Sequence, residues 1–76
     1  MSQIDFNIRI RNSHQSSVSV FLEPWGEVYT LAPNRTLVVK ASGPISDSPD
    51  KMLEVEHAPD SITVYGWSGS GLTIQQ

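Results

Sequence analysis

The chain has 76 residues, with 5 cationic and 8 acidic side chains and a net charge of −3 at pH 7. This length accommodates one hydrophobic core, so we expect a single domain over residues 1–76. The sequence contains no cysteine, which excludes disulfide bonds, thiolate metal sites and a cysteine nucleophile.

The first half of the chain alternates apolar and polar residues with the period of a β-strand. Ile4, Phe6, Ile8 and Ile10 are separated by polar residues, and a polar turn follows. Later segments repeat the alternation or are rich in β-branched residues, and they are separated by proline- or glycine-containing bends. We predict strands over residues 4–11, 17–23, 27–31 and 36–41.

The second half begins with a stretch, SGPISDSPD at residues 42–50, whose composition is typical of a surface loop. Three more strands are predicted after it, over residues 52–57, 61–67 and 72–74. The 5 prolines leave no gap long enough for an ordinary helix and its connections. We therefore expect an all-β fold, a small antiparallel β-sandwich or barrel of about six to seven short strands, with mostly meander connections and no substantial helix.

The parity of the strand residues divides the apolar side chains into two sets. One set is large enough to form the core, and its members are Ile4, Phe6, Ile8, Ile10, Val18, Val20, Leu22, Leu37, Val39, Leu53, Val55, Ile62, Val64, Leu72 and Ile74. The opposite set consists of Phe21, Tyr29, Leu31, Val38, Tyr65 and Trp67. Its aromatic members are predicted to form an outer apolar patch, the kind of surface that marks an interface. The alternative is that bulges reverse the parity and place them in the core.

The bend Glu23-Pro24-Trp25-Gly26 puts a bulky indole between two strands. Proline ends strand pairing, and glycine supplies the backbone freedom for the return. Trp25 is either a plug over the end of the core, with its N–H bonded to a loop carbonyl, or a binding anchor at that end. The candidate binding residues are Trp25, Glu23, Phe21, Tyr29, Tyr65 and Trp67.

No motif indicates catalysis. The stretch Gly66 to Gly71 departs from the nucleophile-elbow pattern, because Ser70 stands where the pattern needs a glycine. His14 and His57 lack the spacing of metal ligands and are interpreted as surface residues. Glu54 and Glu56 share a strand face without a cleft around them. We expect no catalytic residue, no metal and no cofactor, and therefore a protein that is not an enzyme.

The charges also limit the partners. Residues 42–76 contain five acidic residues and one lysine, and no basic stripe occurs anywhere, so we expect no direct binding to nucleic acid. No apolar run approaches the roughly 18 residues of a membrane span. The first residues lack the basic and apolar regions of a signal peptide. A cytoplasmic protein is the simplest expectation.

Two stretches, Phe21-Leu22-Glu23-Pro24-Trp25-Gly26 and Val64-Tyr65-Gly66-Trp67, carry a resemblance. The chain resembles short bacterial all-β proteins that share an L-E-P-W-G stretch and a V-Y-G-W stretch, over residues 17–41 and 53–67. The resemblance implies a bacterial, phage or mobile-element source. It assigns no activity and no role to any residue.

Three functions fit these observations. The first is a non-enzymatic interaction module that binds another protein, or a second copy of itself, through aromatic surface residues, and this is the function we expect. The second is an acidic inhibitor or immunity protein that blocks a basic surface. The third is a module that binds a small ligand or carbohydrate by stacking on Trp25 and Trp67.

Overall fold

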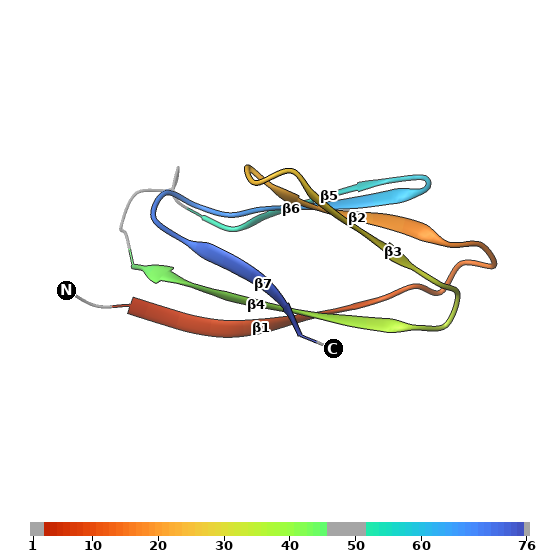
Figure 1. Ribbon diagram of the computed structural model, residues 1–76, viewed down its shortest axis with the longest axis horizontal. Coiled ribbons are helices and arrows are strands. Elements are labelled where there is room, and N and C mark those ends of the chain that lie inside the picture. Colours follow the sequence, from red (N-terminus) through yellow and green to blue (C-terminus); the bar gives the residue numbers. More distant parts are fainter. Residues whose placement is uncertain (1–2, 46–51, 76) are drawn as a thin grey trace.

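The computed structural model describes residues 3–45 and 52–75. All of the regular secondary structure in these residues is β-strand, which confirms the predicted all-β fold. The strands are β1 (Gln3–Arg11), β2 (Val18–Glu23), β3 (Glu27–Leu31), β4 (Thr36–Pro44), β5 (Glu54–Ala58), β6 (Ser61–Tyr65) and β7 (Gly71–Gln75). They form a sandwich of two stacked layers (Figure 1).

The two layers differ in the number of strands. One sheet has three strands in the order β1-β4-β7, and the other has four in the order β3-β2-β6-β5. The pairs are antiparallel except for β2 with β6, which is parallel. Only β2 with β3 and β5 with β6 are both paired and consecutive in the chain. The predicted meander is therefore wrong, because the other connections pass from one layer to the other.

The core lies between the layers and follows the period-two alternation of the strands. Val20, Leu22, Val39, Ala41 and Val64 are completely buried. The other buried apolar residues are Ile10, Val18, Leu31, Leu37, Trp67 and Leu72. Complete burial of one Val or Leu side chain contributes about 1.5–3 kcal/mol, so these residues supply the main apolar burial that favours folding.

The predicted loop at residues 42–50 begins too early. β4 continues through Gly43 to Pro44, and residues 46–51 lie outside the described residues. Gly43 lies beside Ser70, the residue before β7 in the same sheet. A Cβ at Gly43 would lie 2.7 Å from the Ser70 Cα, so only glycine allows this approach. β5 begins at Glu54, two residues after the predicted start at Met52.

Asn12, in the predicted polar turn, is 2% exposed and links three segments at one end of the sandwich. Its Nδ2 donates to the carbonyl oxygens of Ser16 and Leu31, both at 2.9 Å. Its Oδ1 accepts from the backbone N–H of His14 at 2.8 Å. The side chain is thereby fully bonded, and it fixes the connection between β1 and β2 against the end of β3.

Candidate interaction surface

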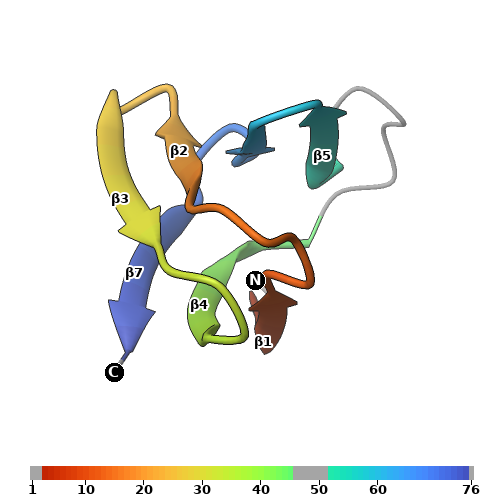
Figure 2. The ribbon, with the colours of Figure 1, turned by 90° about the vertical axis from the view of Figure 1, so that its right-hand side faces the viewer.

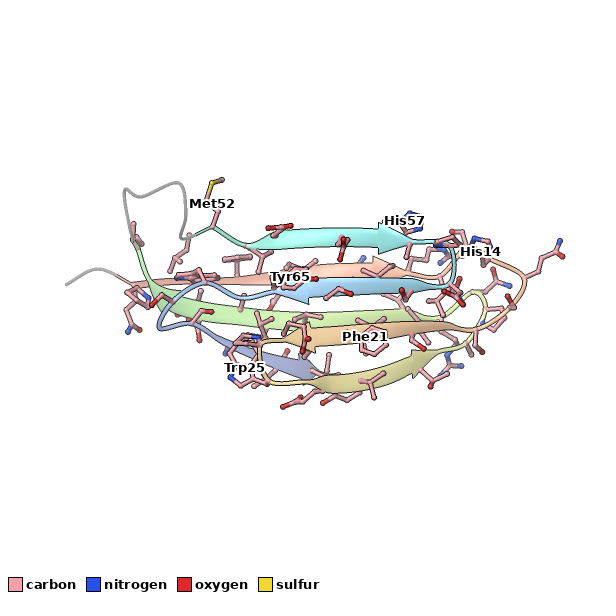
Figure 3. All side chains as sticks on the ribbon, turned by 90° about the horizontal axis from the view of Figure 1, so that it is seen from above. His14, Phe21, Trp25, Met52, His57 and Tyr65 are labelled. Carbon is pink, nitrogen blue, oxygen red and sulfur yellow. The ribbon has the colours of Figure 1, made fainter. Side chains whose placement is uncertain are left out.

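Trp25, in the bend between β2 and β3, packs its indole ring against the C-terminal end of β6. Gly26 has a φ of 76° and donates its N–H to the carbonyl of Leu22 at 3.0 Å, which confirms the need for glycine there. A Cβ at Gly66 would lie 2.8 Å from Cη2 of Trp25, so the ring rests on that glycine. Trp25 remains 44% exposed. It therefore packs on the backbone that follows β6 and stays partly exposed at the bend between β2 and β3 (Figure 3).

Trp67 lies in the core, so its predicted place on an outer face is wrong. It is 8% exposed, and its Nε1 donates to the carbonyl oxygen of Pro44 at 2.8 Å. Its ring stacks on Phe6, with centroids 6.0 Å apart and planes 8° apart. The physical reason is that β6 ends at Tyr65. The chain then crosses to the other layer, and strand alternation no longer decides where the side chain points.

Tyr29 and Leu31 also lie on the inner side, contrary to the prediction. Leu31 is opposite Val18 and Tyr29 is opposite Val20, and both valines face the core. The hairpin pairs Leu22 with Glu27, so β3 starts with an inward residue. The Tyr29 hydroxyl donates to Oε1 of Glu27 at 2.8 Å, and this hydrogen bond raises the pKa of the phenol.

The outer side of the four-stranded sheet keeps three of the six candidate binding residues together. Phe21 is opposite Val28, and Glu23 is opposite Tyr65. Tyr65 donates its hydroxyl to Oε1 of Glu56 at 3.0 Å, which raises the pKa of the phenol. We call this surface the acidic outer face, and its residues are Phe21, Glu23, Val28, Glu54, Glu56 and Tyr65.

The outer side of the three-stranded sheet has the opposite charge. β1 alternates so that Asp5, Arg9 and Arg11 share the side that faces away from the core, and Lys40 lies on the same side of β4. The two outer sides of the sandwich therefore carry charges of opposite sign, which the uneven charge along the sequence only partly indicates.

The sandwich is open along one long side, which is formed by β1 in one sheet and β5 in the other. Figure 2 shows β5 above β1 on this side and β3 above β7 on the other. Ile4 and Val55 were predicted to be core residues and have inward parity, yet they are 41% and 52% exposed. The prediction is wrong for Val55 because the three-stranded sheet ends at β1 and β5 lies beyond that edge (Figure 3), so among the described residues no strand lies directly beneath β5. Ile4 lies near the start of β1 and lines a hollow on this side.

Further apolar side chains gather on this side. Ile45 and Met52 are exposed as well. A hollow of about 250 Å³ opens here, lined by Ile4, Phe6, Pro44, Ile45, Met52, Leu53 and Trp67. We use the name open side for the surface formed by Ile4, Phe6, Ile45, Met52, Leu53 and Val55.

The two histidines come together at one end of the molecule, which their separation in the sequence did not indicate. His14 and His57 both line a second hollow of about 260 Å³ (Figure 3). Within residues 3–45 and 52–75, no three His, Cys, Asp or Glu side chains are grouped so as to hold a metal ion. Two imidazoles alone do not complete a metal site.

Comparison of the sequence with protein-family models, with curated proteins and with solved structures finds no match. The resemblance to short bacterial proteins with L-E-P-W-G and V-Y-G-W stretches stays a prediction. Among the described residues, no helix has the length and hydropathy needed to cross a membrane.

Proposed function

We propose that the protein is a non-enzymatic interaction module that binds another protein through its open side. The observation that carries this proposal is the clustering of Ile4, Ile45 and Met52, three exposed apolar side chains that line one apolar hollow. Val55, which is also exposed, lies on the neighbouring strand β5. Contiguous exposed apolar surface is uncommon on small soluble domains and marks binding sites. Covering such surface with a partner is favourable by about 25 cal/mol per Å².

The walls of the hollow favour an apolar occupant over a sugar. Among the lining side chains, the indole N–H of Trp67 is the only strong hydrogen-bonding group, and it is already donated to Pro44. Sugar hydroxyls placed there would lose their bonds to water without replacement. Side chains of a protein partner carry no such cost, so the carbohydrate hypothesis receives no support from this site.

The test uses a photo-crosslinking amino acid at one of two matched positions. Val55 lies on the open side and is 52% exposed, and Val28 lies on the acidic outer face and is 55% exposed. Each variant is irradiated in cells of the source, and its products are separated by mass. The proposal predicts a discrete protein adduct from position 55 and none from position 28.

The captured protein is then purified and titrated against the parent chain and the Ile4→Ser variant. We expect the variant to keep its fold, because Ile4 is already 41% exposed, and to bind at least about tenfold more weakly. Equal binding by the two chains, or an adduct from position 28 alone, contradicts the proposal.

The acidic outer face supports a second candidate, an inhibitor that blocks a basic surface on another protein. Glu23, Glu54 and Glu56 lie there beside Phe21 and Tyr65, and opposed charges both steer and hold such partners. An adduct from position 28, lost when Glu54 and Glu56 are changed to Gln, is the outcome that favours this candidate.

A further inference from the structure

We propose that the open side accepts an extended segment of the partner as an additional strand, antiparallel to β1. The segment is apolar at alternate positions, acidic opposite Arg9 and Arg11, and basic opposite Asp5. This inference rests on the proposed function and names the chemistry of the occupant.

The backbone of β1 has a free edge. β1 pairs with β4 over nine residues from Gln3 to Arg11, and no strand lies on its other side within the described residues. The alternate N–H and C=O groups of an edge strand that point outward form a template for a further strand. At about 3.3 Å per residue, nine residues offer an edge of roughly 30 Å.

The layer above already extends over the position that the added strand would take. The four-stranded sheet extends past β1, so β5 overhangs the three-stranded sheet (Figures 2 and 3). Val55 and His57 have inward parity and are exposed. A strand beside β1 would make both layers four strands wide and would cover Val55 from below.

The inner row of β1 fits the apolar half of the segment. Exposure of this row decreases along the strand, from Ile4, which is exposed, through Phe6 and Ile8, which are half-buried, to Ile10, which is buried. Side chains of a neighbouring strand lie about 5 Å away on the same face. Alternate apolar residues of the added strand would therefore contact this row, and those opposite Ile4 and Phe6 would reach the hollow that these two residues line.

The outer row of β1 decides the charges of the segment. Asp5, Arg9 and Arg11 project on the solvent side, where opposite charges across a strand pair stabilise it and like charges destabilise it. The free edge of β5 is a poorer template, because Glu54 and Glu56 occupy its outer row. An acidic segment is repelled there and attracted at β1.

A second copy of the chain is a poorer occupant than a strand from another protein. Two β1 strands paired about a two-fold axis could place Asp5 opposite Arg9. That axis is perpendicular to the sheet, so it also brings the two β5 strands to the same place above the joint. Since each β5 overhangs its own β1 (Figure 2), the two would collide.

The probe for the test is a capped seven-residue peptide, Glu-Val-Glu-Val-Thr-Val-Lys. Placed antiparallel to β1, it sets its acidic residues opposite Arg11 and Arg9 and its lysine opposite Asp5. It is titrated into the ¹⁵N-labelled protein and followed by NMR and amide hydrogen exchange. The matched control, Glu-Glu-Lys-Thr-Val-Val-Val, has the same composition without the alternation.

When the alternating peptide binds, we expect slower hydrogen exchange at alternate amides of β1 and a change in the NMR chemical shift of Val55. The amides of β3 and β7 should be unaffected. The Arg9→Glu variant should bind the peptide about fivefold more weakly, since an attractive pair becomes a repulsive one. A peptide with lysine in the third position should recover that loss on this variant. Arg9 is exposed, so the substitution leaves the core intact.

Four results overturn the inference: equal binding of the two peptides, no binding of either, protection on β5 in place of β1, or protection of β1 that rises with protein concentration in the absence of peptide. The last identifies a second copy as the occupant. If the peptide fails while the crosslinker at position 55 still captures a protein, strand addition is wrong and the proposed function stands. Absence of that adduct rejects the proposed function itself.

Discussion

The two long sides of the sandwich are built from inward residues of the same kind and differ in how far the two layers overlap. On the closed side, where β3 lies over β7, Leu31 and Leu72 are buried. On the open side, Ile4 and Val55 have the same parity and are about half exposed. Parity therefore decides which face of a sheet a residue occupies, and the opposite layer decides whether that face is covered.

The two sides also differ in what their apolar side chains do: those of the closed side stabilise the fold, and those of the open side are available for binding. A domain of this size is only marginally stable, and the closed side and centre supply most of its buried apolar surface. The open side contributes little to folding as long as it faces water, so its side chains are available to a partner. The following predictions test this division, from the largest expected effect to the smallest.

The sharpest contrast is between truncations on the two sides. Leu31→Ala removes a buried side chain and should lower the free energy of unfolding by about 3 kcal/mol. Val55→Ala, at an exposed inward position, should change it by less than about 0.5 kcal/mol. Urea unfolding followed by tryptophan fluorescence measures both. Equal losses would mean that the open side is covered in solution.

Gly43 tests whether the backbone next to the open side is tightly packed. Gly43→Ala forces a Cβ to within 2.7 Å of the Ser70 backbone, and we expect a loss of about 2 kcal/mol in the free energy of unfolding. Gly71→Ala is the control, because nothing lies within 4 Å of its added Cβ. Similar thermal unfolding midpoints for the two variants would show that β4 and the segment before β7 move apart easily at this end of the sheet.

Asn12 tests the end of the sandwich at which β1 passes to β2. Asn12→Ala removes the donors to Ser16 and Leu31 from a buried position, and we expect a loss of about 1.5 kcal/mol. Asn7→Ala on the exposed side of β1 serves as the control and should be nearly neutral. Urea unfolding compares them. A neutral Asn12→Ala variant would mean that water replaces the side chain without cost.

The smallest effect concerns the two tyrosines of the four-stranded sheet, Tyr29 on the edge strand β3 and Tyr65 on the inner strand β6. Glu56 raises the pKa of Tyr65 by accepting the phenol hydrogen bond, and Glu27 does the same for Tyr29. Because each pKa is higher in the folded chain than in the unfolded one, the stabilisation is fully present below pH 10 and is lost as the pH rises through the folded value.

Glu56→Gln should lower the pKa of Tyr65 toward 10.0 and leave Tyr29 unchanged. The absorbance of tyrosinate is measured as a function of pH. The control is Glu27→Gln, which removes the carboxylate partner of Tyr29 instead of that of Tyr65. An unchanged titration curve in Glu56→Gln would show that the hydrogen bond is not formed in solution.

Local alternation in the sequence was sufficient to predict the strands, the bends and most of the core. It could not predict the course of the chain between layers, because a polar turn serves equally well for a hairpin and for a crossing. Trp67 was assigned to an outer face because β6 was extended two residues too far. Tyr29 was assigned there because the register across the Trp25 bend depends on how Leu22 pairs with Glu27.

The open side escaped prediction for a related reason. Ile4 and Val55 are indistinguishable by pattern from Ile10 and Val64, which are buried. What separates them is their place in the whole fold. Val55 lies on β5, which extends beyond the three-stranded sheet, and Ile4 lies at the opposite end of β1 from Ile10. On the acidic outer face, the grouping of Phe21 with Tyr65 was predicted from parity, and the strands that carry them, β2 and β6, are direct neighbours in the sheet.

The most direct test of the account is amide hydrogen exchange on the complex between this protein and the partner that the crosslinker at position 55 captures. The account predicts that amides in residues 3–11 become protected on binding, while those in β3 and β7 on the closed side exchange as in the free protein. Protection confined to residues 27–31 or 71–75, with β1 unchanged, would contradict it.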